Sequence, residues 1–247
     1  MIDIHSHILP AVDDGAQTIE EALVLLKLAQ EDGVTTQYLT PHMRPPRYVN
    51  EAVIIRQEFE NFSDIVADKG FSINLRLSAE VRVGPEIMTL LQRDDFPWLG
   101  TWDGKNAFLL EMPHGQVPTG TINLIKWLLQ RNIVPVIVHP ERNREFQSNI
   151  GLLEQYVKAG CLVQITAASL LGKFNDKSER CAIELIEKDL VNFMATDSHN
   201  NFHRPPDLNA GYKRAKELFG KDKAWSLVYE APVKLLSNTD VLSAVSE

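Results

Sequence analysis

The chain has 247 residues, of which 44% are hydrophobic and 23% charged, and its formal net charge is -8. A chain of this length and composition can bury a core without disulfides, and its acidity argues against nucleic-acid binding through the general surface. The N-terminus, MIDIHSHILP, lacks a basic start followed by an apolar run, and no long uninterrupted apolar stretch follows, so we expect neither a signal peptide nor membrane insertion.

Short β-rich runs alternate with amphipathic helical segments from one end of the chain to the other. The expected strands are residues 2–5, 35–40, 72–78, 107–111, 134–139, 162–166 and 193–196. The expected helices are residues 18–31, 50–67, 118–130, 147–159, 177–188 and 206–218. Thr18 and Glu21 are spaced as a capping box, and Gly33, Gly70 and Gly160 stand where helices should end.

This alternation predicts an α/β fold in which parallel strands are covered by helices on the outside. About seven strands favour a closed barrel, with an open, doubly wound sheet as the alternative. We find no linker, repeat or composition break, and therefore expect a single domain over residues 1–247.

The two cysteines, Cys161 and Cys181, belong to no CxxC pair or Cys/His cluster. We expect both to be reduced core residues of a cytoplasmic protein. Neither has an arginine six residues downstream, which is the spacing in the phosphate loop of cysteine-dependent phosphatases. A thiolate mechanism of that kind is therefore not expected.

Side chains that can bind metals stand at or just after the ends of six of the seven expected strands. They are His5, His7, Asp14, His42, Glu80, Glu111, His139, Asp197 and His199. In a parallel barrel these strand ends gather on one face, where barrel active sites are built. A single His or Glu after a strand is usually a cap or a surface residue, but five of the seven histidines of the chain share this placement.

The residue types favour a cluster of divalent ions. Imidazole with carboxylate suits Zn²⁺, Mn²⁺ or Fe²⁺, and the lack of cysteine ligands argues against a structural zinc site. Nine candidates exceed the needs of one ion, so two or three ions sharing a bridging carboxylate are expected. Such a cluster activates water as hydroxide and stabilises an in-line phosphoryl displacement.

Two arginines follow the last candidate ligands. Arg142 comes after His139, and Arg204 comes after His199. A guanidinium pairs well with two phosphate oxygens, although a surface salt bridge explains the spacing as well. Arg44, Arg47 and Tyr48 form a weaker candidate for a rim that receives substrate.

The motifs in this order resemble the PHP (polymerase and histidinol phosphatase) superfamily, and within it the manganese-dependent protein-tyrosine phosphatases of bacterial capsule and exopolysaccharide loci. The resemblance rests on HSHILP at residues 5–10, VDDG at 12–15, TPH at 40–42, AEV at 79–81, LEMP at 110–113, VHPER at 138–142 and TDSHN at 196–200. It covers nearly the whole chain. Met43 differs from the histidine common in that family at this position.

The resemblance implies a distorted TIM-like barrel of seven β/α units, the PHP fold, holding three ions. The first ion would take His5, His7, Glu80 and Asp197; the second Glu111 and His139, with Glu80 bridging; the third Asp14, His42 and His199. Arg142 and Arg204 would hold the phosphate. Manganese is the expected ion, with iron or zinc as alternatives, and Asp14 is the candidate general acid if it is not fully engaged as a ligand.

The implied substrate is phosphotyrosine on the tyrosine-rich tail of an autophosphorylating bacterial kinase that controls polysaccharide export. A small phosphate ester such as histidinol phosphate would need the same chemistry, and so remains an alternative. A nuclease or deaminase fits less well, because the chain is acidic and a deaminase needs fewer ligands. A non-enzymatic metal-binding regulator that docks a kinase is a further alternative, and an oligomer is left open.

Overall fold

Strands and helices alternate along the part of the chain that the computed structural model describes, residues 1–91, 93 and 95–236. The strands are β1 (Ile2–Asp3), β2 (Thr36–Leu39), β3 (His42–Met43), β4 (Asn74–Leu77), β5 (Glu80–Arg82), β6 (Gly100–Trp102), β7 (Lys105–Glu111), β8 (Ile133–Val138), β9 (Leu162–Thr166) and β10 (Phe193–Ala195). The longer helices are α1 (Ile19–Glu31), α2 (Ala52–Asp68), α4 (Thr121–Leu129), α6 (Ile150–Ala159), α8 (Asp176–Glu187) and α9 (Leu208–Phe219). The shorter ones are α3 (Glu86–Leu90), η1 (Pro140–Arg142), α5 (Arg144–Ser148), α7 (Ala167–Leu170), α10 (Lys221–Trp225), η2 (Ser226–Glu230) and α11 (Ala231–Leu235).

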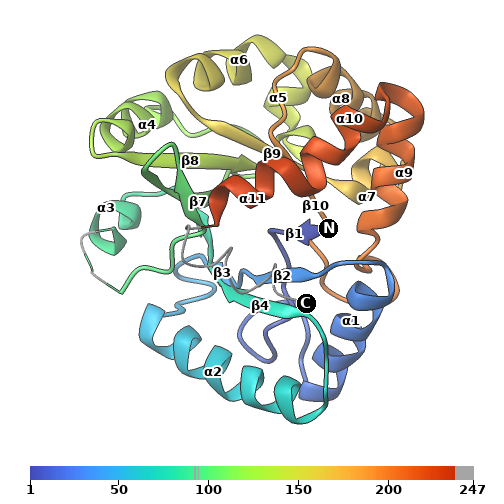
Figure 1. Ribbon diagram of the computed structural model, residues 1–247. Helices are drawn as coiled ribbons and strands as arrows, with labels where there is room; N and C mark the ends of the chain where they lie inside the picture. Colours follow the sequence, from blue (N-terminus) through green and yellow to red (C-terminus); the bar gives the residue numbers. More distant parts are fainter. Residues whose placement is uncertain (92, 94, 237–247) are drawn as a thin grey trace.

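The parallel strands close into a barrel with the helices outside it (Figure 1). One ladder runs β1-β2-β4, and another runs β3-β5-β7-β8-β9-β10. The first ladder continues into the second, because Ser78 N–H donates to Leu39 O at 3.0 Å and Glu80 N–H to Pro41 O at 3.1 Å. The ring closes where Asp197 N–H donates to His5 O at 2.8 Å. The expected barrel is confirmed, and the open, doubly wound alternative is wrong.

Each expected strand and helix is present, with ends that differ by a few residues. Thr18 caps α1, because its side chain accepts the N–H of Glu21 at 3.2 Å. The Glu21 carboxylate accepts the N–H of Gln17 and not that of Thr18, so the predicted capping box is only half formed. Gly33 and Gly160 follow α1 and α6 with φ of 90° and 118°, values that glycine adopts at little cost.

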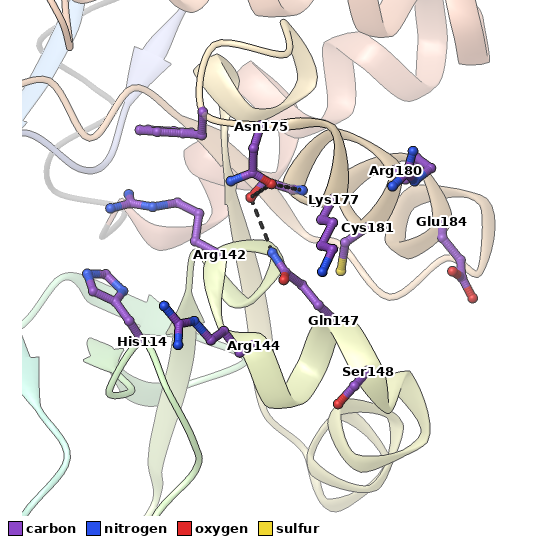
Figure 2. A pocket seen from close by; sticks show the side chains of 12 residues that line it. His114, Arg142, Arg144, Gln147, Ser148, Asn175, Lys177, Arg180, Cys181 and Glu184 are labelled. Carbon is purple, nitrogen blue, oxygen red and sulfur yellow. Dashed lines mark hydrogen bonds between the residues drawn. The ribbon is translucent and has the colours of Figure 1, made fainter.

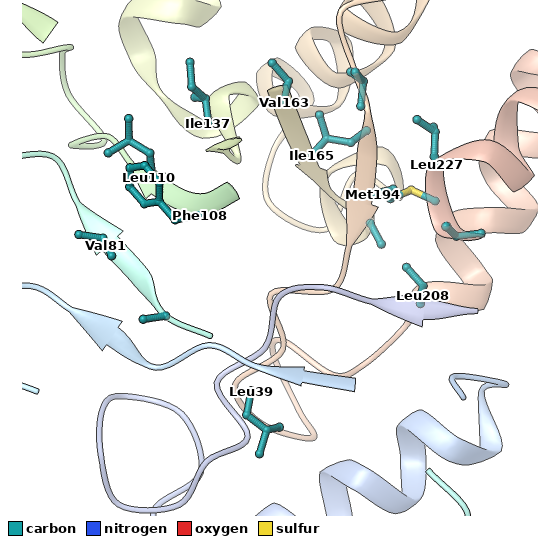
Figure 3. Packing of buried hydrophobic residues seen from close by; sticks show 14 of the residues in the cluster. Leu39, Val81, Phe108, Leu110, Ile137, Val163, Ile165, Met194, Leu208 and Leu227 are labelled. Carbon is teal, nitrogen blue, oxygen red and sulfur yellow. The ribbon is translucent and has the colours of Figure 1, made fainter. Parts of the chain in front are cut away.

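Two apolar clusters lie on the two sides of the strands. Phe108 and Leu110 of β7 belong to the larger cluster, between the strands and the surrounding helices (Figure 3). Ala107 and Leu109 belong to the smaller one, which fills the barrel. Because side chains alternate along a strand, Glu111 continues the inward-facing series at the carboxyl end of β7. The barrel core thus ends in a polar layer at this mouth.

The other mouth of the barrel is closed by the end of the described chain. Helix α11 packs against β6 and β1 and places Leu235 in the inner apolar cluster. A Cβ atom at position 100 of β6 would lie 2.0 Å from the Leu235 carbonyl oxygen, so the close packing of α11 on β6 requires glycine at this position. Among residues 1–91, 93 and 95–236, none of the helices combines the length and apolar character needed to cross a bilayer.

Candidate metal centre

The nine predicted ligands meet at the polar mouth of the barrel. Three overlapping groups of side chains lie close enough to hold ions: His5, His7 and Glu80; His42, Glu80 and Glu111; and His7, Asp14, His42 and His199. Asp197 and His139 join them through contacts to His5 and Glu80. Of the nine, only Asp14 is exposed. The structure therefore brings together residues from 5 to 199, while their role as ligands stays a prediction.

In the first predicted ion site, two imidazole nitrogens lie close to two carboxylate oxygens. His5 Nε2 lies 3.3 Å from His7 Nε2, 3.6 Å from Glu80 Oε2 and 3.5 Å from Asp197 Oδ1. His7 Nε2 lies 3.4 Å from that Glu80 oxygen and 3.3 Å from Asp197 Oδ1. The His5, His7 and Glu80 atoms lie close enough together to bind one ion, and Asp197 Oδ1 approaches the same two imidazole nitrogens. The donor set fits a divalent ion.

The third predicted site is also assembled. Asp14 Oδ1 lies 3.4 Å from His42 Nε2 and 3.7 Å from His199 Nε2. The second site is arranged differently from what the resemblance implies, because Glu111 groups with His42 and Glu80. His139 Nε2 instead contacts Glu80 Oε1 at 2.7 Å.

Two buried carboxylate oxygens at this site accept no hydrogen bond of good geometry from the described residues. They are Glu111 Oε2 and Glu80 Oε2, and the second lies 2.7 Å from His42 Nδ1 as an ion pair. A buried carboxylate oxygen without a donor is costly unless a cation neutralises it. Arg82 neutralises the other Glu111 oxygen, since its Nη1 lies 2.5 Å away. The unpaired Glu111 oxygen is a second reason to conclude that the site accommodates cations.

Hydrogen bonds at the Nδ1 atoms orient three of the imidazoles. His7 Nδ1 lies 2.7 Å from Asp13 Oδ2, and His5 Nδ1 lies 2.9 Å from Gln164 Oε1. His199 Nδ1 lies 2.9 Å from the Asp197 carbonyl oxygen. An oxygen at Nδ1 holds the proton there and leaves the Nε2 lone pair free for an ion. All three Nε2 atoms face the cluster.

Among the residues that support the ligands, Asp13 is the one whose substitution we expect to lower metal affinity or activity most. Its Oδ2 also accepts the backbone N–H of His42 at 3.0 Å, and its Oδ1 accepts that of Gly15 at 2.9 Å. We expect Asp13→Asn to lower metal affinity or kcat/KM about 10- to 100-fold, because the amide no longer enforces the His7 tautomer. Metal titration and kinetics on the folded variant measure this. Unchanged affinity and rate would show that Asp13 serves only the turn.

The metal-free cluster holds protons that ions must displace. Burial alone would lower the pKa of His42, but the Glu80 carboxylate raises it to about 9. Burial likewise opposes protonation of His7, yet Asp13 raises its pKa well above the usual value. Both rings are therefore charged at neutral pH without an ion, and must lose a proton to bind one.

Metal affinity should accordingly rise with pH. Below pH 9 the raised pKa of His42 means that each binding event releases its proton, so affinity should increase about tenfold per pH unit for each proton displaced. Competition with a chelator of known affinity at several pH values between 6.5 and 8.5 measures the slope. A flat profile would contradict the placement of His42 in the ion site.

The two predicted phosphate-binding arginines converge on one atom. Arg142 Nη1 and Arg204 Nη2 both donate to Asp197 Oδ2. Burial opposes ionisation, but Arg204 and His5 hold the pKa of Asp197 well below its usual range. Both guanidinium groups thus lie beside the ion cluster. A phosphate entering there would find two cationic donors.

The predicted rim residues lie at the same mouth. The Tyr48 ring stacks on His42 with centroids 5.4 Å apart, and Arg47 lies 5.0 Å over the Tyr48 ring. Arg47 Nη2 is 4.0 Å from Asp14 Oδ2.

Burial raises the pKa of the two thiols, Cys161 and Cys181, to about 12, so neither is a thiolate nucleophile.

Sequence reasoning missed the residues that support the ligands. Asp13 stands in the sequence only as a member of the VDDG motif, and the motifs contain neither Gln164 nor Arg82. A signal existed for Gln164, which interrupts the apolar run of β9 and is fully buried. A buried amide in such a strand needs a polar partner inside the barrel.

Comparisons with known proteins agree along the whole chain. A family model described as "Capsular polysaccharide synthesis, CpsB/CapC" matches residues 1–237. The chain is 34% identical over 241 residues to a putative tyrosine-protein phosphatase CapC of Staphylococcus aureus, covering 96% of this chain and 89% of that one. It is 32% identical over 243 residues to the tyrosine-protein phosphatase YwqE of Bacillus subtilis, covering 97% and 93%.

Solved structures give the same result for the fold. Crystal structures described as those of YwqE from Bacillus subtilis and CpsB from Streptococcus pneumoniae, unique metal-dependent tyrosine phosphatases, match with a TM-score of 0.88 and 30% identity. The match covers 95% of this chain and 94% of the other. A phosphotriesterase homology protein from Escherichia coli matches with a TM-score of 0.56 and 13% identity, which supports the barrel fold alone.

Proposed function

The chain belongs to the CpsB/CapC family of capsular polysaccharide synthesis, and we infer from this that it is a metal-dependent tyrosine-protein phosphatase. The observation that carries the inference is the buried group of His, Glu and Asp side chains at the mouth of the barrel. The reaction is the hydrolysis of a phosphoric monoester.

Each part of the site has a role in this reaction. We propose that His5, His7, Asp14, His42, Glu80, Glu111, His139, Asp197 and His199 hold two or three divalent ions. When bound, the ions supply a Lewis acid that activates water and neutralises charge on the phosphate. Arg142 and Arg204 bind the phosphate oxygens and orient the ester.

Asp14 is placed to handle the proton of the leaving tyrosine. Its side chain is 41% exposed at the open side of the site, beside His42 and His199. The hydrogen bond with His42 lowers the pKa of its carboxyl, so Asp14 is ionised at neutral pH without bound ions. We propose that Asp14 donates the proton to the leaving phenolate through the carboxylate oxygen that is not engaged by an ion.

Manganese is the ion we propose, with iron and zinc as alternatives that the same donors accept. The proposed substrate is phosphotyrosine on the tyrosine-rich tail of a bacterial kinase, in the cytoplasm, and the proposed catalytic unit is a single domain. Support comes from the capsule-synthesis family and from the arginines beside the cluster.

The test compares substrates and metals in one set of assays. Purified protein is stripped with a chelator, and hydrolysis of a phosphotyrosine peptide and of histidinol phosphate is followed with Mn²⁺, Fe²⁺ or Zn²⁺ added. We expect the peptide to be hydrolysed only after metal is restored. Preference for histidinol phosphate would favour the small-ester alternative, and tight peptide binding without turnover would favour a regulator.

A further inference from the structure

A polar cavity lies beside the proposed phosphate-binding residue Arg142, outside the ligand cluster. Its volume is about 880 Å³, and it is lined by residues of η1, α5 and the first turns of α8. Figure 2 shows Arg142 and Arg144 on the side of His114. Lys177 and Arg180 of α8 lie on the other side of Gln147. The mechanism proposed above uses Arg142 alone among these side chains.

The lining of this cavity is basic in an acidic protein. It carries Arg142, Arg144, Lys177 and Arg180 against one carboxylate, Glu184, whereas the whole chain has a net charge of -8. Burial lowers the pKa of His114, so that ring adds no charge at neutral pH. Lys177 and Arg180 are three residues apart on α8 and share one face of the helix.

Three of these cations are available to a ligand. Arg144, Lys177 and Arg180 are exposed, and none makes an ion pair with any residue that the structure describes. Arg142 differs, because its guanidinium donates to Asp197 and lies 4.6 Å over the Phe174 ring. A cluster of unpaired cations around a cavity repels itself and attracts anions.

Arg142 connects the cavity to the ion site. Its side chain is 14% exposed, borders the cavity on one side and contacts a predicted metal ligand on the other. A peptide whose phosphotyrosine reaches the ions on the Arg142 side therefore lays its neighbouring residues over or beside the cavity. The cavity is larger than a phosphate group needs, so it can take a side chain of that peptide.

We propose that this basic cavity is a subsite for a second anionic group of the substrate peptide, close to the phosphotyrosine in its sequence. The recognised chemistry is an oxyanion, supplied by an Asp or Glu carboxylate or by a second phosphotyrosine. This inference rests on the proposed phosphatase function and adds a specificity to it. It assigns Arg144, Lys177 and Arg180 to substrate selection.

The experiment measures kcat and KM for three phosphotyrosine peptides that differ only near the phosphotyrosine. One has neutral flanks, one has aspartates, and one has a second phosphotyrosine. We expect the anionic peptides to have a KM about tenfold lower than the neutral one, as two or three exposed charge pairs give. The better of the two anionic peptides identifies the source of the oxyanion.

Variants assign the preference to the cavity. Arg144→Gln/Lys177→Gln/Arg180→Gln should remove the preference while leaving kcat/KM for the neutral peptide within about twofold. Arg144→Gln alone should give a smaller loss in the same direction. The matched control is Lys69→Gln/Lys126→Gln/Lys216→Gln, which removes the same charge from exposed sites outside the lining.

Several results would overturn the subsite. Equal KM values for the three peptides in the wild-type protein would do so while leaving the phosphatase function intact. An equal loss of preference in the control variant would show general steering by net charge, not a subsite. Absence of hydrolysis of all three peptides by the metal-loaded protein would overturn the phosphatase function and the subsite together.

Discussion

His5→Ala should lower kcat/KM for a phosphotyrosine peptide by about 10³-fold or more. His5 Nε2 lies within 3.6 Å of ligand atoms of His7, Glu80 and Asp197 in the first predicted ion site. Loss of this ligand weakens the binding of an ion that stabilises the charge of the transition state by several kcal/mol. A loss of about 4 kcal/mol corresponds to a rate lower by nearly 10³-fold. Kinetics at saturating Mn²⁺, together with elemental analysis of the purified variant, measure both consequences.

The fold should survive this change. The His5 side chain is buried but contacts mainly other polar groups of the cluster, including the Gln164 amide at 2.9 Å. His203→Ala is the matched control, because His203 is exposed and lies outside the predicted ligand set. Wild-type kinetics and metal content in a folded His5→Ala protein would contradict the ion site, whatever the family.

The barrel was predictable because its signal is repeated along the chain. Most of the seven expected strands are apolar runs separated by amphipathic segments, and this alternation favours a parallel sheet covered by helices. The missed helices α3, α5, α7, α10 and α11 have four or five residues, too few to show a helical period. Strands β3, β5 and β6 lie outside the expected strands, because two or three residues are too few to show a strand pattern.

The predicted ligands were accessible from sequence because topology places strand ends together. Glu111 follows from β7, since Ala107, Leu109 and Glu111 alternate on the inward side. Contacts across long sequence separations were not accessible. The hydrogen bond of His5 with Gln164 spans 159 residues, and no local pattern in the sequence predicts it.

Pairing within the site was also hidden from the sequence. Spacing alone gave a surface salt bridge and a phosphate ligand equal standing for Arg142, and the structure shows a contact to Asp197 that is compatible with both. Arg204 reaches the same oxygen from a different loop. Two partly buried guanidinium groups on one carboxylate oxygen leave donors to spare, because each guanidinium has five N–H groups.

Arg142→Met/Arg204→Met should lower kcat/KM by about 10²- to 10⁴-fold. Hydrogen bonds to charged groups contribute about 1.5 to 3 kcal/mol each, and two guanidiniums are lost. Methionine keeps much of the side-chain length and apolar volume, so packing against Phe174 is preserved in part. The Arg142→Lys/Arg204→Lys variant should recover some activity, because lysine keeps the positive charge but lacks the planar guanidinium that binds two phosphate oxygens. Arg214→Met, at an exposed pair with Glu179, is the control.

Metal content decides between the two roles of these arginines. If they bind phosphate, the double methionine variant keeps its ions, while inhibition by inorganic phosphate weakens in proportion to kcat/KM. If they serve only to orient Asp197, ions are lost with activity, and phosphate inhibition per metal-loaded molecule is unchanged. Because both guanidiniums meet the Asp197 oxygen that faces away from His5 and His7, we expect the first result. The phosphate would then take up donors that the carboxylate leaves free.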